Sequence, residues 1–156
     1  MKYLFPNLKN ATQDSLFTKG KHFLIGVICL LLLALWVVVV INRYSDFDIF
    51  NANMQALPFA GWLNDMIALL VSGLEPVAAL LLIWGQSRVF GLWLSCFLLV
   101  SYTCYIGMVL LGFFGSIPCT CASPISGLSW TQHFFFNLSA SGIAGLGVYL
   151  EPTSKQ

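Results

Sequence analysis

The chain has 156 residues, of which 58% are hydrophobic and only 8% are charged. Soluble domains carry about 25% charged residues, so this composition excludes an ordinary water-soluble protein and indicates one membrane-embedded domain. The formal net charge of +1 provides no strongly basic surface, so we expect no nucleic-acid partner.

Four apolar blocks follow one another along the chain. A bilayer core about 30 Å thick needs about 20 helical residues, and each block comes close to that length. We predict an all-α polytopic membrane protein that inserts in a lipid bilayer as a bundle of four transmembrane helices. The helices are expected at about 22–41, 63–84, 89–115 and 130–150. They form one domain over 22–150, between an N-terminal tail of residues 1–21 and a C-terminal tail of residues 151–156.

The basic residues predict the orientation of this bundle. Only Arg43 lies on one side of the predicted helices. The other six Lys and Arg residues lie on the opposite side: Lys2, Lys9, Lys19, Lys21, Arg88 and Lys155. Because Lys and Arg favour the cytoplasmic side, both tails should be cytoplasmic. The loops after the first and third helices should then face outward, from a bacterial inner membrane.

The first outward loop is predicted to contain a short helix. Ser45 and Asp48 have the spacing of a capping box at its start. An apolar stripe would let this helix lie in the membrane interface. The stripe consists of Phe47, Phe50, Met54 and Leu57. An irregular loop anchored by aromatic residues is the alternative.

Glu75 is the only charged residue of the apolar block 66–84, and Pro76 follows it. An ionised carboxylate at the bilayer centre costs roughly 2.5–3.5 kcal/mol, and we expect no Lys or Arg at that depth. Glu75 is therefore predicted to be protonated, or bonded to hydroxyls such as Ser72, Ser101 or Tyr102. Two roles stay open: a satisfied polar group inside the bundle, or a proton relay that shapes a quinone or substrate cleft.

Two of the five cysteines, Cys119 and Cys121, lie on a polar loop outside the apolar blocks. A disulfide between residues i and i+2 must bend the backbone, and strained, exposed disulfides are the readily reduced ones. We predict a redox pair. Two other interpretations stay open, namely a metal site and two structural thiols. With His133 the loop offers three ligands, short of a closed zinc site, so we expect no metal. The remaining cysteines are predicted to be packing residues: Cys29, Cys96 and Cys104.

The fourth predicted helix begins with Ser129 and Gln132, which have capping-box spacing. Trp130, His133, Asn137 and Ser141 follow at spacings of three and four and share one face. The helix N-terminus and His133 would both favour a cysteine thiolate, while Trp130 would support the loop. Small residues further along predict close helix packing. They are Ala140, Gly142, Ala144, Gly145 and Gly147.

Three stretches resemble the MauE family of four-helix membrane proteins, related to DoxX. They are "GLEPVAALLLIWG", "SYTCYIG" and the C-x-C pair followed by L-S-W-x-x-H-x-x-x-N. The matching residues are Glu75, Cys119, Cys121, Leu128, Ser129, Trp130, His133 and Asn137. The resemblance implies a role in maturing a secreted disulfide-rich redox enzyme, the methylamine dehydrogenase small subunit, beside an extracytoplasmic thioredoxin-like partner. A similar four-helix layout in vitamin K epoxide reductase suggests a quinone cofactor, by analogy of fold.

The predicted function is therefore thiol–disulfide exchange at the membrane, as in an oxidoreductase. One cysteine of the pair attacks a partner's disulfide and the other resolves the adduct. Two alternatives remain. The chain could be a non-catalytic scaffold or chaperone for a periplasmic partner, or a quinol- or small-solute-binding subunit centred on Glu75.

Overall fold

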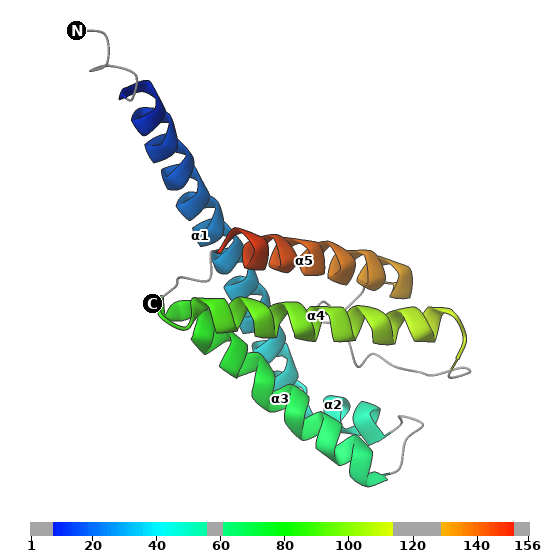
Figure 1. Cartoon of the computed structure of the whole chain (residues 1–156). Coiled ribbons are helices and arrows are strands. Elements are labelled where there is room, and N and C mark those ends of the chain that lie inside the picture. The colour runs from blue at the N-terminus through cyan, green and yellow to red at the C-terminus, as the bar shows by residue number, and fades with distance from the viewer. Residues whose placement is uncertain (1–7, 56–60, 114–128, 152–156) are drawn as a thin grey trace, which may run out of the picture.

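A computed structural model of the protein describes residues 8–55, 61–113 and 129–151. These residues form five helices and no strand: α1 (Leu8–Ser45), α2 (Phe47–Gln55), α3 (Gly61–Ile83), α4 (Arg88–Leu110) and α5 (Trp130–Leu150) (Figure 1). The predicted all-α class is confirmed for this part of the chain.

Three segments are long and apolar enough to cross a membrane: Lys19–Ser45, Gly61–Ile83 and Arg88–Leu110. They fit a polytopic membrane protein. The 21 residues of α5 extend over about 31 Å at 1.5 Å per residue, close to the thickness of a bilayer core. However, α5 is not among the three segments, so the count of four spans stays a prediction.

Two helices have other bounds than the sequence suggested. α1 begins at Leu8 and ends at Ser45, beyond the expected 22–41, because no proline interrupts it; Arg43 is therefore helical. α4 ends at Leu110 rather than 115. Gly112 there has a φ of 76°, and the amide of Phe113 donates to the carbonyl of Met108. This is a Schellman ending, in which glycine adopts the left-handed conformation.

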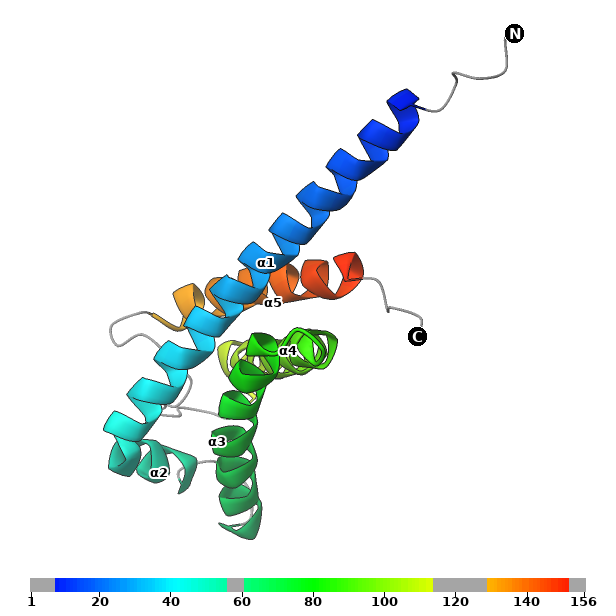
Figure 2. The same cartoon turned by 90° about the vertical axis from the view of Figure 1, so that its left-hand side faces the viewer.

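The long helices pack as a bundle in which α4 lies between α3 and α5, while α1 contacts α3 and α5. One end, called here the turn end, contains residues 84–87 between α3 and α4. The opposite end, the loop end, contains α2 and the start of α5. Figures 1 and 2 show α4 and α5 running side by side, whereas α3 diverges from α4 towards the loop end.

The core consists of stripes spaced three and four residues apart, the pattern of helices with one buried face. On α1 the stripe includes Ile25, Ile28, Leu32 and Trp36. The buried indole of Trp36 donates a hydrogen bond of 2.9 Å to the hydroxyl of Ser95 on α4. This bond satisfies both polar groups in the centre of an apolar core.

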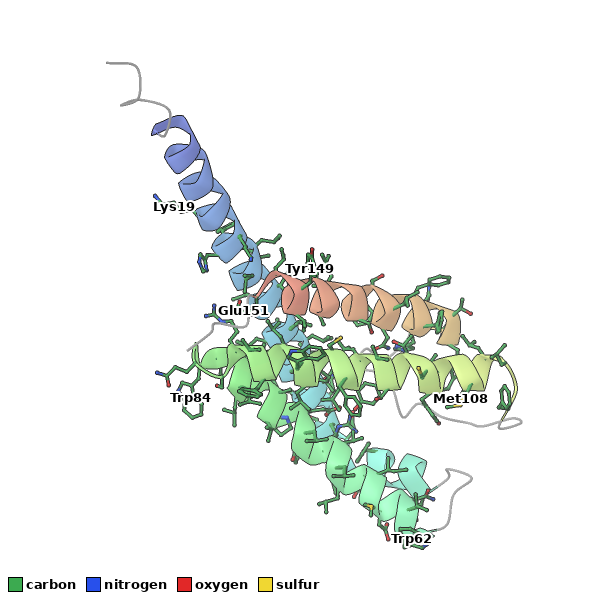
Figure 3. All side chains as sticks on the ribbon, in the orientation of Figure 1. Lys19, Trp62, Trp84, Met108, Tyr149 and Glu151 are labelled. Atoms are coloured by element: carbon green, nitrogen blue, oxygen red, sulfur yellow. The ribbon has the colours of Figure 1, made fainter. Side chains whose placement is uncertain are left out.

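Aromatic side chains project outward near the helix ends (Figure 3). Trp62 at the loop end of α3 and Trp84 just beyond its turn end are each 67% exposed. Tyr149, at the turn end of α5, is 84% exposed. Tryptophan and tyrosine at both ends of apolar helices are typical of the two membrane–water interfaces.

The helices approach most closely at the turn end. A Cβ atom at Gly91 would lie 2.9 Å from the backbone nitrogen of Leu82, and one at Gly147 would lie 2.9 Å from Leu92 Cδ2. Ala140, Ala144 and Gly147 are buried, as predicted for close packing. At Gly142 and Gly145, by contrast, an added Cβ atom would meet nothing within 4 Å, so these two glycines do not serve such contacts.

Replacing Gly91 by alanine should destabilise the bundle by about 1–3 kcal/mol, because the new methyl group meets backbone atoms that cannot yield easily. Gly142→Ala is the matched control, since it adds the same methyl to a helix where space is open. Thermal unfolding in detergent measures both. Equal midpoints for the two variants would contradict the close approach of α3 and α4.

Candidate functional site

The predicted redox pair, Cys119 and Cys121, falls outside the described part of the chain. Its segment joins the end of α4 to the start of α5. Of the other cysteines, Cys29 is buried as predicted and Cys96 is partly buried. Cys104 is exposed on α4, so the prediction that it packs inside the bundle is wrong.

The start of α5 is fixed by the predicted capping box, which the structure confirms. The amide of Ser129 donates to Gln132 Oε1 at 2.8 Å, and the amide of Gln132 donates to Ser129 Oγ at 3.4 Å. Trp130, the first helical residue, is partly buried. The box satisfies amides that no helical carbonyl can reach and so sets where the next residues point.

His133 lies one turn into α5 and is only 4% exposed. Within the part of the chain that the structure describes, neither ring nitrogen has a hydrogen-bond partner. Leaving a buried polar group unsatisfied costs about 1–3 kcal/mol, which makes such groups rare in a purely structural role. A neutral imidazole in this state can still accept a proton on one nitrogen and donate from the other.

Asn137 and Ser141 continue the His133 face along α5, as the spacing predicted. Asn137 is buried, and its Nδ2 donates to the carbonyl of His133 at 3.1 Å. Ser141 donates to the carbonyl of Asn137 at 2.8 Å and lies 3.3 Å from the hydroxyl of Thr103 on α4. This polar seam joins α5 to α4. We call the two helices together the α4–α5 hairpin.

Glu75 is fully buried and forms an ion pair with Arg43 of α1. Arg43 Nε donates to Glu75 Oε2 at 2.8 Å, and Nη2 donates to Oε1 at 2.5 Å. This two-bond geometry matches a guanidinium to a carboxylate. The prediction of a protonated Glu75 without a basic partner is therefore wrong, because Arg43 reaches back along the helix from the loop end.

The predicted hydroxyl partner of Glu75 is confirmed for Tyr102 of α4, which donates to Oε1 at 2.5 Å. Ser101, the other hydroxyl suggested on α4, donates to the carbonyl of Phe97 instead. Both oxygens of Glu75 are thus engaged by described side chains. One carboxylate links three helices: α1 through Arg43, α3 through its own backbone, and α4 through Tyr102.

The short helix α2 joins this network through Phe50. The Arg43 guanidinium carbon lies 4.2 Å from the centroid of the Phe50 ring, and the ring packs against Ile67, Ala68 and Tyr105. A cation over an aromatic face is attractive, more so where water is excluded. We call Arg43, Phe50, Glu75, Tyr102 and Tyr105 the loop-end cluster.

The predicted short helix is confirmed as α2, but its start and its stripe differ from expectation, and its place in the membrane interface stays a prediction. It begins at Phe47, so Asp46 rather than Ser45 precedes its first residue. Phe50 is buried, whereas Phe47 is half exposed. Gln55, its last residue, donates to Asp65 of α3 at 2.5 Å. α2 is thus fastened to the bundle at Phe50 and Gln55.

The functional residue that sequence reasoning missed is Arg43, which was placed in an outer loop. The available signal was the absence of proline and glycine between the apolar run and Ser45, which lets the helix continue through Arg43. In the described ranges, no three histidine, cysteine or acidic residues gather in a way that could hold a metal ion.

A model of one protein family, described as methylamine utilisation protein MauE, matches residues 21–150. The chain belongs to the MauE family. The match spans α1 from its apolar part through the end of α5, and therefore includes the C-x-C segment, the His133 face and the loop-end cluster. The MauE-type chain is a multi-pass membrane protein. No curated protein and no solved structure matches it.

Breaking the ion pair should be costly. Glu75→Gln leaves the Arg43 charge partly buried without its partner, so it should destabilise the protein by about 3–5 kcal/mol. Arg43→Gln should act similarly, and the double variant should be more stable than the sum of the two losses implies. Unfolding in detergent measures the double-mutant cycle, with the exposed Asp48→Asn as control. If the losses of unfolding free energy in the two single variants add up to the loss in the double variant, the ion pair is contradicted.

Proposed function

We propose that this MauE-type protein exchanges thiols and disulfides through Cys119 and Cys121 with a thioredoxin-like partner outside the cytoplasm. The observation that carries the proposal is His133. It is buried, both its ring nitrogens lack a partner among the described residues, and it lies twelve positions after Cys121. An imidazole at that position can serve the chemistry of thiols presented by the preceding segment.

The exchange is balanced between two proteins. The thiolate of one cysteine attacks the partner's disulfide, a mixed disulfide forms, and one partner sulfur leaves as a thiolate that takes up a proton. The second cysteine then attacks the mixed disulfide, which releases the partner as a dithiol and leaves Cys119 and Cys121 oxidised. The reverse sequence oxidises the partner. After the forward sequence a second thiol protein, or a quinol, would reduce the pair again; after the reverse sequence a second disulfide, or a quinone, would oxidise it again.

His133 accepts the proton of the attacking thiol in this proposal and returns it to the leaving thiolate. Its position one turn inside the N-terminus of α5 places it where the helix dipole also favours negative charge. Trp130, Ser129 and Gln132 hold the start of the helix, and Asn137 packs beneath His133. These residues support the site without reacting.

The orientation rests on the distribution of basic residues. Lys19, Lys21 and Arg88 lie towards the turn end, and the loop end carries Arg43, which is neutralised by Glu75. We place the turn end and both termini in the cytoplasm, α5 as a fourth span, and the C-x-C segment outside the bacterial inner membrane. The family description points to a role in methylamine utilisation. Within that role, we propose maturation of a secreted or periplasmic protein as the physiological task.

The Glu75-centred alternative loses support from the geometry of the site. A quinol- or solute-binding role needs an accessible carboxylate, whereas Glu75 is fully buried and both its oxygens are engaged by Arg43 and Tyr102. The scaffold alternative differs from the proposal in one testable respect, because a scaffold does not need cysteines that alternate between the reduced and the oxidised state.

Replacing the resolving cysteine by serine should trap the other cysteine in a mixed disulfide with its partner. Cys119→Ser and Cys121→Ser are expressed separately in cells that contain the native partners, and membranes are run on non-reducing gels. One variant should accumulate an adduct that reductant removes, because the second thiolate that normally resolves it is gone. The other variant should trap little.

His133→Ala added to the trapping variant should slow adduct formation by about tenfold or more without abolishing it. His22→Ala, at an exposed histidine of α1 away from the loop end, is the control and should have no effect. Absence of any adduct from both cysteine variants, together with full function of the double serine variant, would refute exchange and favour a scaffold.

A further inference from the structure

The α4–α5 hairpin is held to the rest of the bundle unevenly along its length. At the turn end, Gly91 lies against the backbone of Leu81 and Leu82, and Gly147 lies against Leu92 and Ile28. Towards the loop end, α3 moves away from α4 (Figure 1). If the hairpin moves as a unit, these contacts, to backbone atoms at Gly91 and to side chains at Gly147, are its pivot, and its far end depends on longer side chains.

The hairpin is tightly joined within itself. Thr103 and Ser141 are within 3.3 Å of each other across α4 and α5, and a Cβ at Gly107 would lie 3.5 Å from the Phe134 ring. Ala140 and Ala144 are buried in the common core. A displacement of α4 at the loop end should therefore carry α5 with it.

The side chain of Tyr102 connects α4 by a hydrogen bond to the ion pair between Glu75 of α3 and Arg43 of α1. Its hydroxyl donates to Glu75, which Arg43 in turn fixes to α1 and, through Phe50, to α2. At 1.5 Å per residue, Tyr102 lies about 17 Å from the pivot at Gly91, and Leu110 about 29 Å. A rigid rotation of α4 about this pivot would thus move the end of α4, where the C-x-C segment begins, nearly twice as far as Tyr102.

We propose that the hydrogen bond from Tyr102 to Glu75 is a positioning link that holds the loop end of the α4–α5 hairpin against α1, α2 and α3. The link sets where the segment with Cys119 and Cys121 is presented to its partner. This inference rests on the proposed function. Tyr102 and Glu75 do not react: they act through the placement of both ends of that segment.

The link has a direct geometric test that needs no thiol exchange. Spin labels on Trp62→Cys and Leu111→Cys, in full-length protein whose five native cysteines are replaced, report the distance between the loop ends of α3 and α4. Both positions are exposed, at 67% and 76%. Tyr102→Phe removes the donor and keeps the ring. It should shift the population towards longer distances by about tenfold, the usual scale for losing a hydrogen bond to a charged group.

Thr103→Val is the matched control, because it removes a hydroxyl from the next residue of α4 whose hydrogen bonds, among the described residues, stay within the hairpin. Its distance distribution should equal that of the parent. An unchanged distribution for Tyr102→Phe, or an equal change in Thr103→Val, would overturn the link whatever the cysteines do.

The functional consequence is measured in the trapping cysteine-to-serine variant, with the other native cysteines in place. Tyr102→Phe should slow mixed-disulfide formation with the protein partner at least about threefold, since a smaller fraction of molecules has the loop end of the hairpin held against α1, α2 and α3. Its reduced thiols should react with a small aromatic disulfide at the parental rate, because their chemistry is unaltered. A longer distance with unchanged trapping would overturn the positioning role alone. Failure of both Cys119→Ser and Cys121→Ser to trap any partner would refute the proposed function itself.

Discussion

The loop-end half of this protein depends on one buried charge pair. Glu75 or Arg43 without its partner would destabilise the protein in an apolar surrounding. The two side chains must therefore stay in contact, and this fixes the helices that carry them. The carboxylate accepts from α1 and α4 at the same time, and the guanidinium stacks on Phe50 of α2. A membrane protein lacks a strong hydrophobic force between helices, so such polar contacts and close packing of small residues must specify the arrangement.

Different kinds of contact hold the helices together at the two ends of the bundle. At the turn end, Gly91 and Gly147 let backbones and branched side chains approach directly. At the loop end the helices diverge, and the longer side chains of the loop-end cluster connect them. In our proposal, the hydrogen bonds at the loop end hold the ends of α4 and α5 and so position the segment that joins them. His133, which is buried and has no hydrogen-bond partner among the described residues, follows that segment in sequence.

Much of the fold was predictable because its signals are local. The capping box of Ser129 and Gln132 marked the start of α5 to the residue, and the spacing of His133, Asn137 and Ser141 indicated their common face. The all-α class followed from composition. The Glu75–Arg43 pair was not predictable in the same way, because depth was judged from each residue's position along the chain. A long arginine side chain reaches several ångströms back along its helix, and helix tilt changes which residues share a level. The exposure of Cys104 depended likewise on the rotation of α4, which its nearly uniform apolarity does not reveal.

The ionisation of Glu75 is the central claim, and infrared difference spectroscopy tests it most directly. Spectra of the protein and its Glu75→Gln variant, compared in the same detergent near neutral pH, isolate the bands of this one side chain. A pair with Arg43 predicts that the variant loses carboxylate bands and no carbonyl band of a protonated carboxylic acid. Loss of a protonated-acid carbonyl band on substitution would show that Glu75 is neutral, and would contradict the ion pair on which the arrangement of the loop end depends.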